Sequence, residues 1–245
     1  MNKTPKIIHY CWFGNNPKPT SVLKYIENWK SVLPDYEIVE WNESNFDINV
    51  CDYTKQAYEQ KKFAFVSDYA RLFALYHHGG IYLDTDVEVV KDLTPILNKV
   101  ECVFGFEEKN AIATSTIIAK SKNSFILQFM QSYHKRKFVK VNGELDVTTN
   151  VEHLTKQLDK IGMIQNGEEQ ILIFEKSNIL ILPQQYLSPY DYINLIDNSD
   201  SDTYTIHHYG NSWGDNKSKF NHFVKSQVVK LFGGVFFKLL RKTFK

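Results

Sequence analysis

The clearest pattern of hydrophobic and polar positions lies in residues 62–90, KFAFVSDYARLFALYHHGGIYLDTDVEVV. Its first half places large apolar side chains at helical spacing, at Phe65, Leu72, Phe73 and Tyr76. Gly79 and Gly80 then stop this helix, because glycine accepts the positive φ that a helix end often requires. Ile81–Leu83 is short, apolar and rich in strand-forming residues. The stretch therefore predicts a buried helix, a glycine stop and a central strand that ends in acidic residues.

The same patterns extend along most of the chain and alternate between strand and helix, which is typical of an α/β fold. Predicted strands cover residues 6–13, 37–41, 81–83, 87–90, 101–106, 111–119, 171–174 and 178–182. Predicted helices cover residues 20–32, 51–60, 62–78 and 123–137, and a loop into a further helix covers 146–158.

Composition agrees with one compact domain, which we expect over residues 1–215. The chain has 245 residues, 43% of them hydrophobic, enough to build a sizeable core and to exclude a disordered class. The net charge of +1 gives no indication of a nucleic-acid partner. Three widely spaced cysteines favour a reducing cytosol over a disulfide framework. No secretory signal is expected, and no stretch reaches the roughly 20 apolar residues of a membrane-spanning helix.

Two carboxylates follow the predicted central strand directly, at Asp84 and Asp86. Strand side chains alternate, so Tyr82, Asp84 and Asp86 are expected on one face and Ile81, Leu83 and Thr85 on the other. Such a concentration of negative charge suits a divalent cation with oxygen ligands, Mg²⁺ or Mn²⁺. A solvated Asp-x-Asp turn is the alternative.

Asp68 and Arg71 lie three residues apart on the helix before this strand and share one of its faces. Their neighbours are apolar on most sides, so a buried pair with a functional reason is expected. The alternative is a weak ion pair on the surface.

The segment YTIHHYGNSW, residues 204–213, holds a second group of candidate ligands far along the chain. Imidazole suits Mn²⁺ better than Mg²⁺, so a histidine here could complete a metal site begun by the two aspartates. His207 is the first candidate and His208 the runner-up. Two structural histidines beside a loop glycine are the alternative.

These segments, in this order, resemble the sugar-nucleotide signature of DXD glycosyltransferases. The resemblance is strongest to the Och1-like family and more distant to the glucosyltransferase domains of large clostridial toxins. It covers roughly residues 5–213 and rests on four blocks: Pro5–His9 with Trp12, Asp68-x-x-Arg71 with Gly79–Asp86, the loop 146–158, and His207 with Ser212 and Trp213.

The resemblance implies a GT-A fold, a Rossmann-like α/β/α sandwich with a mixed central sheet. It also implies a metal, Mn²⁺ or Mg²⁺, held by Asp84, Asp86 and His207. Asp84, Asp86 and Arg71 would be the catalytic residues. Contacts to the donor would come from Trp12, Asn45, Asp68, Arg71, Tyr82, Asp84, Thr149, Asn150, Ser212 and Trp213.

Several of these donor contacts have structural alternatives. Trp12, expected to stack on the base, could be a core residue, and Asn45 could cap its loop. Thr149 and Asn150 could form an ordinary helix N-cap. The chain also departs from the family pattern, with Ser115 where asparagine is frequent and Thr149-Asn150-Val151 where Gly-Pro is usual.

The implied reaction is transfer of a sugar, with retention, from a nucleotide sugar to a hydroxyl group, and a UDP-sugar is favoured. We expect a glycan or a lipid-linked oligosaccharide as acceptor, in surface polysaccharide synthesis of the capsular or O-antigen type. The alternatives are a toxin-like protein glycosyltransferase, a metal-dependent sugar-nucleotide hydrolase and a non-catalytic binding module.

The last 30 residues differ in kind from the rest. Residues 217–245 hold eight lysines and arginines and no acidic residue, interleaved with phenylalanine, leucine and valine. We expect residues 216–245 to form a basic amphipathic helical tail that lies on an anionic membrane. The protein would then be cytoplasmic and peripheral at the inner face of the membrane. A terminal helix packed on the domain is the alternative.

Overall fold

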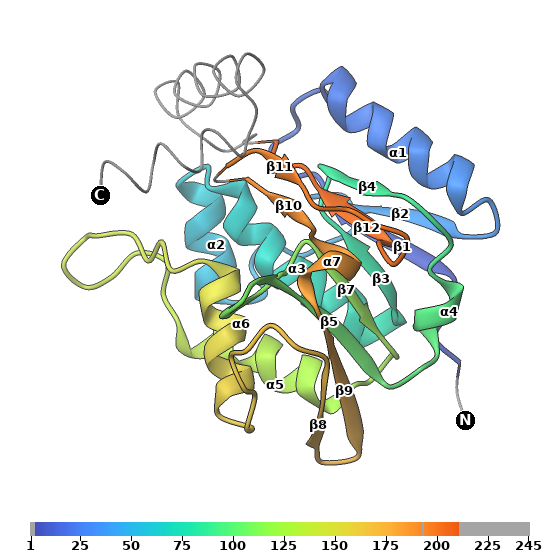
Figure 1. Cartoon of the computed structure of the whole chain (residues 1–245). Coiled ribbons are helices and arrows are strands. Elements are labelled where there is room, and N and C mark those ends of the chain that lie inside the picture. The colour runs from blue at the N-terminus through green and yellow to red at the C-terminus, as the bar shows by residue number, and fades with distance from the viewer. Residues whose placement is uncertain (1–2, 193, 211–245) are drawn as a thin grey trace, which may run out of the picture.

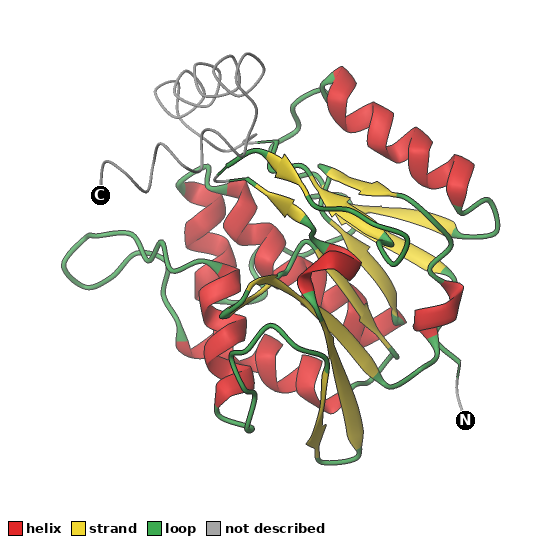
Figure 2. Ribbon diagram, viewed as in Figure 1, coloured by secondary structure: helices red, strands yellow, loops and turns green. Residues whose placement is uncertain are grey.

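A mixed sheet runs through the middle of the protein and helices cover both of its faces (Figures 1 and 2). The structure, a computed structural model, describes residues 3–192 and 194–210. Ser212, Trp213 and the expected tail 216–245 lie outside the described residues.

The main sheet has eight strands. Seven follow the order β2-β1-β3-β7-β5-β9-β8, and β6 pairs with β5. Their bounds are β1 Ile7–Cys11, β2 Glu37–Trp41, β3 Gly80–Leu83, β5 Cys102–Glu108, β6 Ala111–Ile112, β7 Thr116–Ala119, β8 Gln170–Phe174 and β9 Ser177–Leu182. Two small antiparallel sheets lie apart from it: β4 Val87–Val89 with β12 Thr205–His207, and β10 Tyr190–Asp191 with β11 Ile196–Asp197.

The helices divide between the two faces of the main sheet (Figure 1). Those on one face are α2 Asp52–Glu59, α3 Phe63–His78, α5 Ser124–Ser132 and α6 Asn150–Asp159, with the 3-10 turn η1 Tyr133–Lys135 after α5. The other face carries α1 Thr20–Val32 and the short helices α4 Thr94–Leu97 and α7 Gln184–Leu187. Among the residues described, no helix has both the length and the apolar character needed to cross a membrane.

Pairing directions make this a mixed sheet. Strand β1 is parallel to both β2 and β3, whereas β7 is antiparallel to its neighbours β3 and β5. Strand β5 is parallel to β9, and β9 forms a hairpin with β8. The expected α/β/α sandwich with a mixed central sheet is therefore confirmed.

Alternation along the central strands supplies two separate cores. In β3, Tyr82 belongs to the core beneath α2, α3 and α5, whereas Ile81 and Leu83 belong to the core beneath α1. Both cores are almost closed to solvent; Ile81 and Leu83 are 0% exposed and Tyr82 is 2% exposed. The two faces predicted for this strand are thus the faces that the structure shows.

Three expected elements differ in detail. The strand expected over 111–119 is split into β6 and β7 by Ala113–Ser115, and the peptide groups of this break serve the site described below. The helix expected over 123–137 becomes α5 followed by a 3-10 turn. The strand after Asp86 forms, as β4, but it leaves the main sheet and pairs with β12.

Candidate functional site

The two aspartates directly follow β3, an inner strand of the main sheet, at its carboxyl end. The backbone N–H of Asp84 donates to Ser115 O at 2.8 Å, and the N–H of Val87 donates to Asp84 O at 3.0 Å. The chain therefore turns over Asp84–Val87 instead of continuing as one strand. This turn sends β4 away from the main sheet, toward β12 and its histidine.

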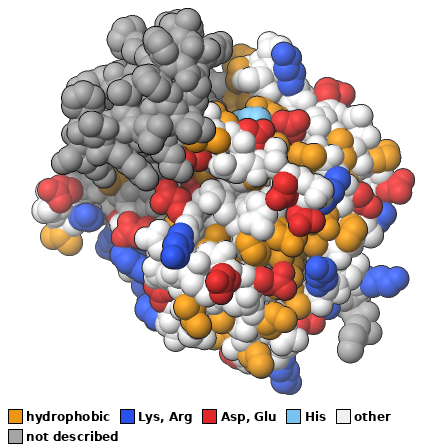
Figure 3. Space-filling model, viewed as in Figure 1, with side chains coloured by type: hydrophobic (Ala, Val, Ile, Leu, Met, Phe, Trp, Pro, Cys, Tyr) orange, Lys and Arg blue, Asp and Glu red, His pale blue; other side chains and the backbone are white. Residues whose placement is uncertain are grey.

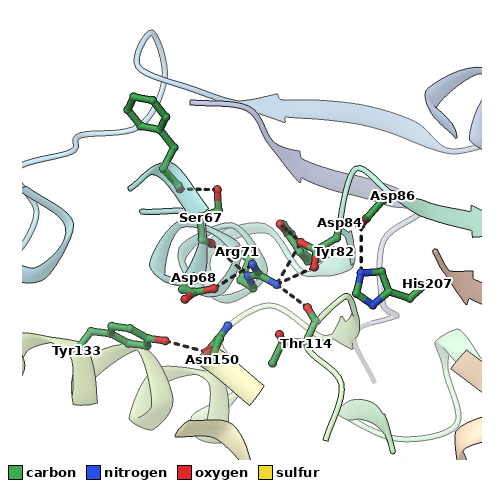
Figure 4. Close-up of polar contacts among 11 residues, drawn as sticks. Ser67, Asp68, Arg71, Tyr82, Asp84, Asp86, Thr114, Tyr133, Asn150 and His207 are labelled. Atoms are coloured by element: carbon green, nitrogen blue, oxygen red, sulfur yellow. Dashed lines mark hydrogen bonds and ion pairs between the residues drawn. The ribbon is translucent and has the colours of Figure 1, made fainter. Parts of the chain in front are cut away.

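Strand β12 brings His207 to these aspartates from more than a hundred residues away. One ligand atom each from Asp84, Asp86 and His207 lie within 4.8 Å of one another (Figure 4). His207 Nε2 is 3.2 Å from Asp86 Oδ1, and the N–H of Gly210 donates to Asp86 Oδ2 at 2.7 Å. His207 Nδ1 is buried and has no hydrogen-bond partner among the described residues.

Neighbouring charges raise the pKa of His207 and lower the pKa of Asp86. Burial alone would lower the pKa of His207, but Asp86, Asp84 and Glu107 outweigh it and raise this pKa above its usual value. Burial alone would likewise raise the pKa of Asp86, but His207 and backbone donors lower it. Without a cation, the pair therefore favours an imidazolium beside a carboxylate.

The donor atoms of this cluster fit a divalent cation. Two carboxylates and an imidazole form a mixed oxygen and nitrogen set that suits Mn²⁺. A cation would replace the proton on His207 Nε2, the nitrogen that faces Asp86, and would also be held by the carboxylates of Asp84 and Asp86. We refer to Asp84, Asp86 and His207 below as the acidic cluster.

Arg71 on α3 contacts Asp84 of this cluster, and the Arg71 side chain is only 6% exposed. Its guanidinium donates to Thr114 O at 2.7 Å and to Asp68 Oδ1 at 3.0 Å, and Nη1 is 3.3 Å from Asp84 Oδ1. Its plane also lies over the Tyr82 ring, 4.5 Å from the ring centroid. Arg71 and Asp68 thus form a buried pair, and Arg71 acts on Asp84 as a positioning residue.

Tyr82 fixes the same carboxylate from the strand. Its hydroxyl donates to Asp84 Oδ1 at 2.8 Å, and its own side chain is buried. The Asp84 carboxylate is therefore contacted by Arg71 and Tyr82. The Asp86 carboxylate is contacted by His207 and by the N–H of Gly210.

Asp68 and Asn150 are two buried polar residues near Arg71 (Figure 4). Burial raises the pKa of Asp68 to about 6, despite the opposing charge of Arg71. The Asn150 carbonyl oxygen accepts a 2.8 Å hydrogen bond from the Tyr133 hydroxyl. Its amide nitrogen is buried and has no partner among the described residues, and in Figure 4 the side chain points toward Asp68 and Arg71. A buried donor of this kind needs an acceptor from outside the described residues, which makes Asn150 a candidate ligand contact.

Two other predicted donor contacts have local structural roles. Asn45 accepts from Asn42 N at 2.9 Å and donates to Glu40 O at 2.7 Å, so its amide closes the loop after β2. Thr149 is the N-cap of α6 and accepts from Glu152 N at 3.2 Å. For both residues the structure shows the capping alternative.

Trp12 lies directly after β1 and is only partly buried, against the core beneath α1. Its indole N–H donates to Asn16 O at 2.7 Å, which orients the ring. A partly exposed ring at the carboxyl end of a parallel strand remains available to a nucleotide base.

His208, the runner-up ligand, lies outside the acidic cluster. Its Nε2 is 2.8 Å from Glu88 Oε2, and its ring stacks on Tyr25 with centroids 5.4 Å apart. Successive side chains of an extended segment point in opposite directions, so the imidazole of His207 faces Asp86 and that of His208 faces Glu88. Ser212 and Trp213 stay predictions, because they lie beyond the described residues.

Glu107, at the end of β5, is a further carboxylate that the sequence reasoning missed. Burial raises its pKa, and it interacts with the charge of His207 and with the hydroxyl of Tyr209. The Tyr209 ring in turn lies against His207, with centroids 3.9 Å apart. Glu107 carries no motif of its own in the sequence, so only the pairing of β5 could have placed it here.

Comparison with known proteins agrees with this site. Residues 19–103 match the family described as "Glycosyltransferase sugar-binding region containing DXD motif". Two relatives in Schizosaccharomyces pombe are inositol phosphoceramide mannosyltransferases. The first, mannosyltransferase 1, is 27% identical over 145 residues, 55% of this chain and 44% of the relative. The second, mannosyltransferase 3, is 36% identical over 101 residues, 38% of this chain and 27% of the relative.

An uncharacterized glycosyltransferase, L373 of Acanthamoeba polyphaga mimivirus, is 26% identical over 60% of each chain. The matched part of this chain covers less than half the length of each of the two S. pombe relatives. The resemblance to DXD glycosyltransferases that the motifs indicated is confirmed.

Two solved structures with some likeness to this fold are named glycosyltransferases in their titles. PaToxG glycosyltransferase aligns with a TM-score of 0.47 at 20% identity, over 65% of this chain and 72% of that one. A glycosyltransferase that acts in glycosylation of the major capsid of PBCV-1 aligns with a TM-score of 0.48 at 10% identity, over 93% and 100%.

Proposed function

We propose that this chain, whose residues 19–103 match the sugar-binding region of DXD glycosyltransferases, is a metal-dependent retaining hexosyltransferase. It moves a sugar from a nucleoside diphosphate sugar to a hydroxyl group of a glycan or a lipid-linked oligosaccharide. The observation that carries this proposal is the acidic cluster, in which Asp84, Asp86 and His207 converge at the end of β3.

The residues of the cluster would hold Mn²⁺ or Mg²⁺. When bound, the cation would neutralise the donor diphosphate and stabilise the charge that develops on it as it leaves. Arg71 and Tyr82 hold Asp84 in place, and Gly210 holds Asp86, so the ligands are oriented before the donor arrives.

The sugar would lie beside the cluster, against Asp68 and Asn150. The carboxylate of Asp68 accepts hydrogen bonds from sugar hydroxyl groups, and the free amide nitrogen of Asn150 donates one. Trp12 would lie against the base, where stacking is worth ~1–3 kcal/mol in nucleic-acid complexes.

Transfer with retention needs no activated side chain if both oxygens occupy the same face of the sugar. The bond from the anomeric carbon to the diphosphate oxygen breaks, and its electron pair stays on the diphosphate. The acceptor oxygen forms the new bond on the same side, and its proton passes to the departing phosphate oxygen.

One experiment, a screen of nucleotide sugars, identifies the donor. A UDP-sugar is favoured, and a mannose donor is the other candidate because the S. pombe relatives are named mannosyltransferases. We would measure the melting temperature of the full chain with Mn²⁺ and each of UDP-glucose, UDP-galactose, UDP-N-acetylglucosamine and GDP-mannose. A matching donor raises it by mass action, and release of the nucleoside diphosphate then reports turnover.

The proposal fails if none of these donors shifts the melting temperature in the presence of Mn²⁺. A turnover rate that no glycan acceptor increases would instead favour a sugar-nucleotide hydrolase. Binding without turnover would favour a binding module.

The setting proposed for this reaction is the cytoplasmic face of a membrane, in surface polysaccharide synthesis. It is supported by the composition of residues 217–245, with eight basic residues and no acidic one. A lipid-linked acceptor lies in the plane of the bilayer, so an enzyme held there meets it at a raised local concentration.

A further inference from the structure

A pocket of about 270 Å³ lies between the end of β5, the start of α7 and the β10–β11 hairpin. Residues that line it include Glu107, Glu108, Lys109, Gln184, Tyr190 and Asp191. Figure 1 shows β10, β11 and α7 on the same side of the molecule as β12, which carries His207. Neither the motifs of the sequence nor the donor residues described above account for this pocket.

Aromatic rings connect the pocket to the acidic cluster. Tyr192 lines the pocket and lies against Tyr209 with centroids 4.5 Å apart, and Tyr209 lies against His207 at 3.9 Å. Glu107 borders both sites, because its carboxylate lines the pocket and also interacts with His207 and Tyr209. A ligand in the pocket would therefore lie next to a donor held at the cluster.

Several polar side chains of the pocket wall have unused hydrogen-bonding capacity. The side chains of Glu108, Lys109 and Gln184 make no hydrogen bond or ion pair with any residue that the structure describes. The ring of Tyr190 offers an apolar surface beside them, half-buried at the wall. Amide, carboxylate and ammonium groups next to an aromatic ring match the alternation of hydroxyl groups and C–H faces on a sugar.

The charge of the wall restricts the kind of sugar. Three carboxyl groups, of Glu107, Glu108 and Asp191, face one ammonium group, of Lys109. Even with Glu107 protonated, the two other carboxylates outnumber the ammonium group. Figure 3 shows acidic and basic side chains interspersed over the visible face of the molecule, so the charge of the pocket is read from its lining residues. A phosphorylated ligand would meet like charges here.

We infer that this pocket is the acceptor subsite and that it takes an uncharged sugar unit, oriented by Gln184 and Tyr190 with its reactive hydroxyl toward Glu107. This inference rests on the proposed transferase function and adds the class of acceptor to it. It sets this chain apart from the relatives whose printed name carries a phosphorylated acceptor, inositol phosphoceramide.

The test is direct binding of simple sugars to the full chain in the presence of Mn²⁺ and UDP. The probes are the methyl α-glycosides of glucose, galactose and mannose, with mannose 6-phosphate as the charged probe, followed by saturation-transfer NMR. The variants are Gln184→Ala and Tyr190→Ala. Gln131→Ala is the matched control, because Gln131 is exposed on α5, a helix on the other face of the main sheet.

At least one neutral glycoside should bind the wild type and the Gln131→Ala variant. Its affinity should fall tenfold or more in Gln184→Ala and Tyr190→Ala, and mannose 6-phosphate should bind the wild type more weakly. The inference is overturned if no neutral glycoside binds, if Gln184→Ala binds it as well as the control does, or if the phosphorylated sugar binds more tightly. Should Tyr190→Ala unfold, Gln184→Ala carries the test alone.

Release of nucleoside diphosphate by the wild type separates this inference from the proposed function. Metal-dependent donor turnover without glycoside binding sinks the acceptor subsite and leaves the transferase standing. If a glycoside binds, Gln184→Ala weakens that binding and no donor is turned over, the sugar-binding pocket stands and the transferase function falls.

Discussion

At the scale of single residues, Asp86 is the point where two distant parts of the chain meet. One of its oxygens contacts His207 and the other accepts from Gly210, although the residue itself follows β3. The space around Gly210 is correspondingly tight, since a Cβ there would lie 3.2 Å from Asp86 Cβ. The carboxylate is thereby held in one orientation, as a metal ligand requires.

The first prediction concerns the acidic cluster. Asp86→Asn removes a carboxylate ligand with little change of shape, so Mn²⁺-dependent donor turnover should fall by at least about 100-fold. The stabilisation by Mn²⁺ in a melting experiment should disappear with it. Glu88→Gln is the matched control, because Glu88 lies two residues further on and pairs with His208 outside the cluster. Equal loss in both variants would argue against Asp86 as a ligand.

A second prediction concerns Arg71. Arg71→Ala leaves Asp68 and Asp84 without their buried counter-charge, which should lower the free energy of unfolding by about 3–5 kcal/mol. Denaturation with urea measures it. The control is Lys156→Ala, which breaks the exposed Lys156–Glu152 pair and should cost at most ~0.5 kcal/mol. Similar values for the two variants would show that Arg71 is not the centre of a buried network.

Spacing alone related residues that lie close together in the sequence, whereas His207 was named through its chemistry and the family resemblance, and Glu107 was missed. Asp84 and Asp86 could be found because strand alternation and a nearby turn relate them directly. Asn45 and Thr149 make capping hydrogen bonds, because a short polar side chain readily reaches the backbone of its own loop, and their contacts to a donor stay predictions. Glu107 could not be found, since its approach to His207 depends on where β5 lies in the sheet.

At the scale of elements, the approach of β1 to β3 decides where the site is built. Gly80 opens β3 with a φ of 108°, and a Cβ on it would lie 2.5 Å from the carbonyl oxygen of Ile7. Only glycine therefore allows the parallel pairing that places Asp84 beside Cys11, the last residue of β1. The sequence indicated a helix stop at this glycine, whereas its closeness to another backbone appears only in the structure.

The third prediction follows from this close approach. Gly80→Ala should lower the free energy of unfolding by more than Gly162→Ala, because both alter a positive φ but only Gly80 is crowded. Gly162 has a φ of 97° with nothing within 4 Å of an added Cβ. Strain in φ costs about 1–2 kcal/mol at either position, and the collision should add about 1–3 kcal/mol at Gly80. Equal urea midpoints would show that β1 moves aside without cost.

At the scale of the whole molecule, hydrophobic periodicity predicted the layers correctly because each strand and helix carries its own buried face. The helix 20–32 and the strand 37–41 appear with the expected bounds. The order of strands and the departure of β4 were not predicted, since no local pattern specifies which strands pair. The chain was also expected to carry a membrane-directed tail, and that expectation stays a prediction.

The fourth prediction concerns that tail. The full chain should bind vesicles that contain phosphatidylglycerol at low salt and leave them as salt rises, because screening weakens attraction to anionic lipid. Replacing Arg241, Lys242 and Lys245 with glutamine should weaken binding, at about 1 kcal/mol per residue. Lys156→Gln on α6 is the control. Binding that ignores salt, or no binding at low salt, would contradict a peripheral membrane role.

The pairing of β4 with β12 has a consequence during synthesis of the protein on the ribosome. Both aspartates leave the ribosome early, but the imidazole that completes their cluster follows only about 120 residues later, as the spacing of His207 and Asp86 requires. A nascent chain that has folded as far as β9 already holds the carboxylates and lacks the histidine. The proposed metal site therefore gains its third ligand only after most of the domain has been synthesised.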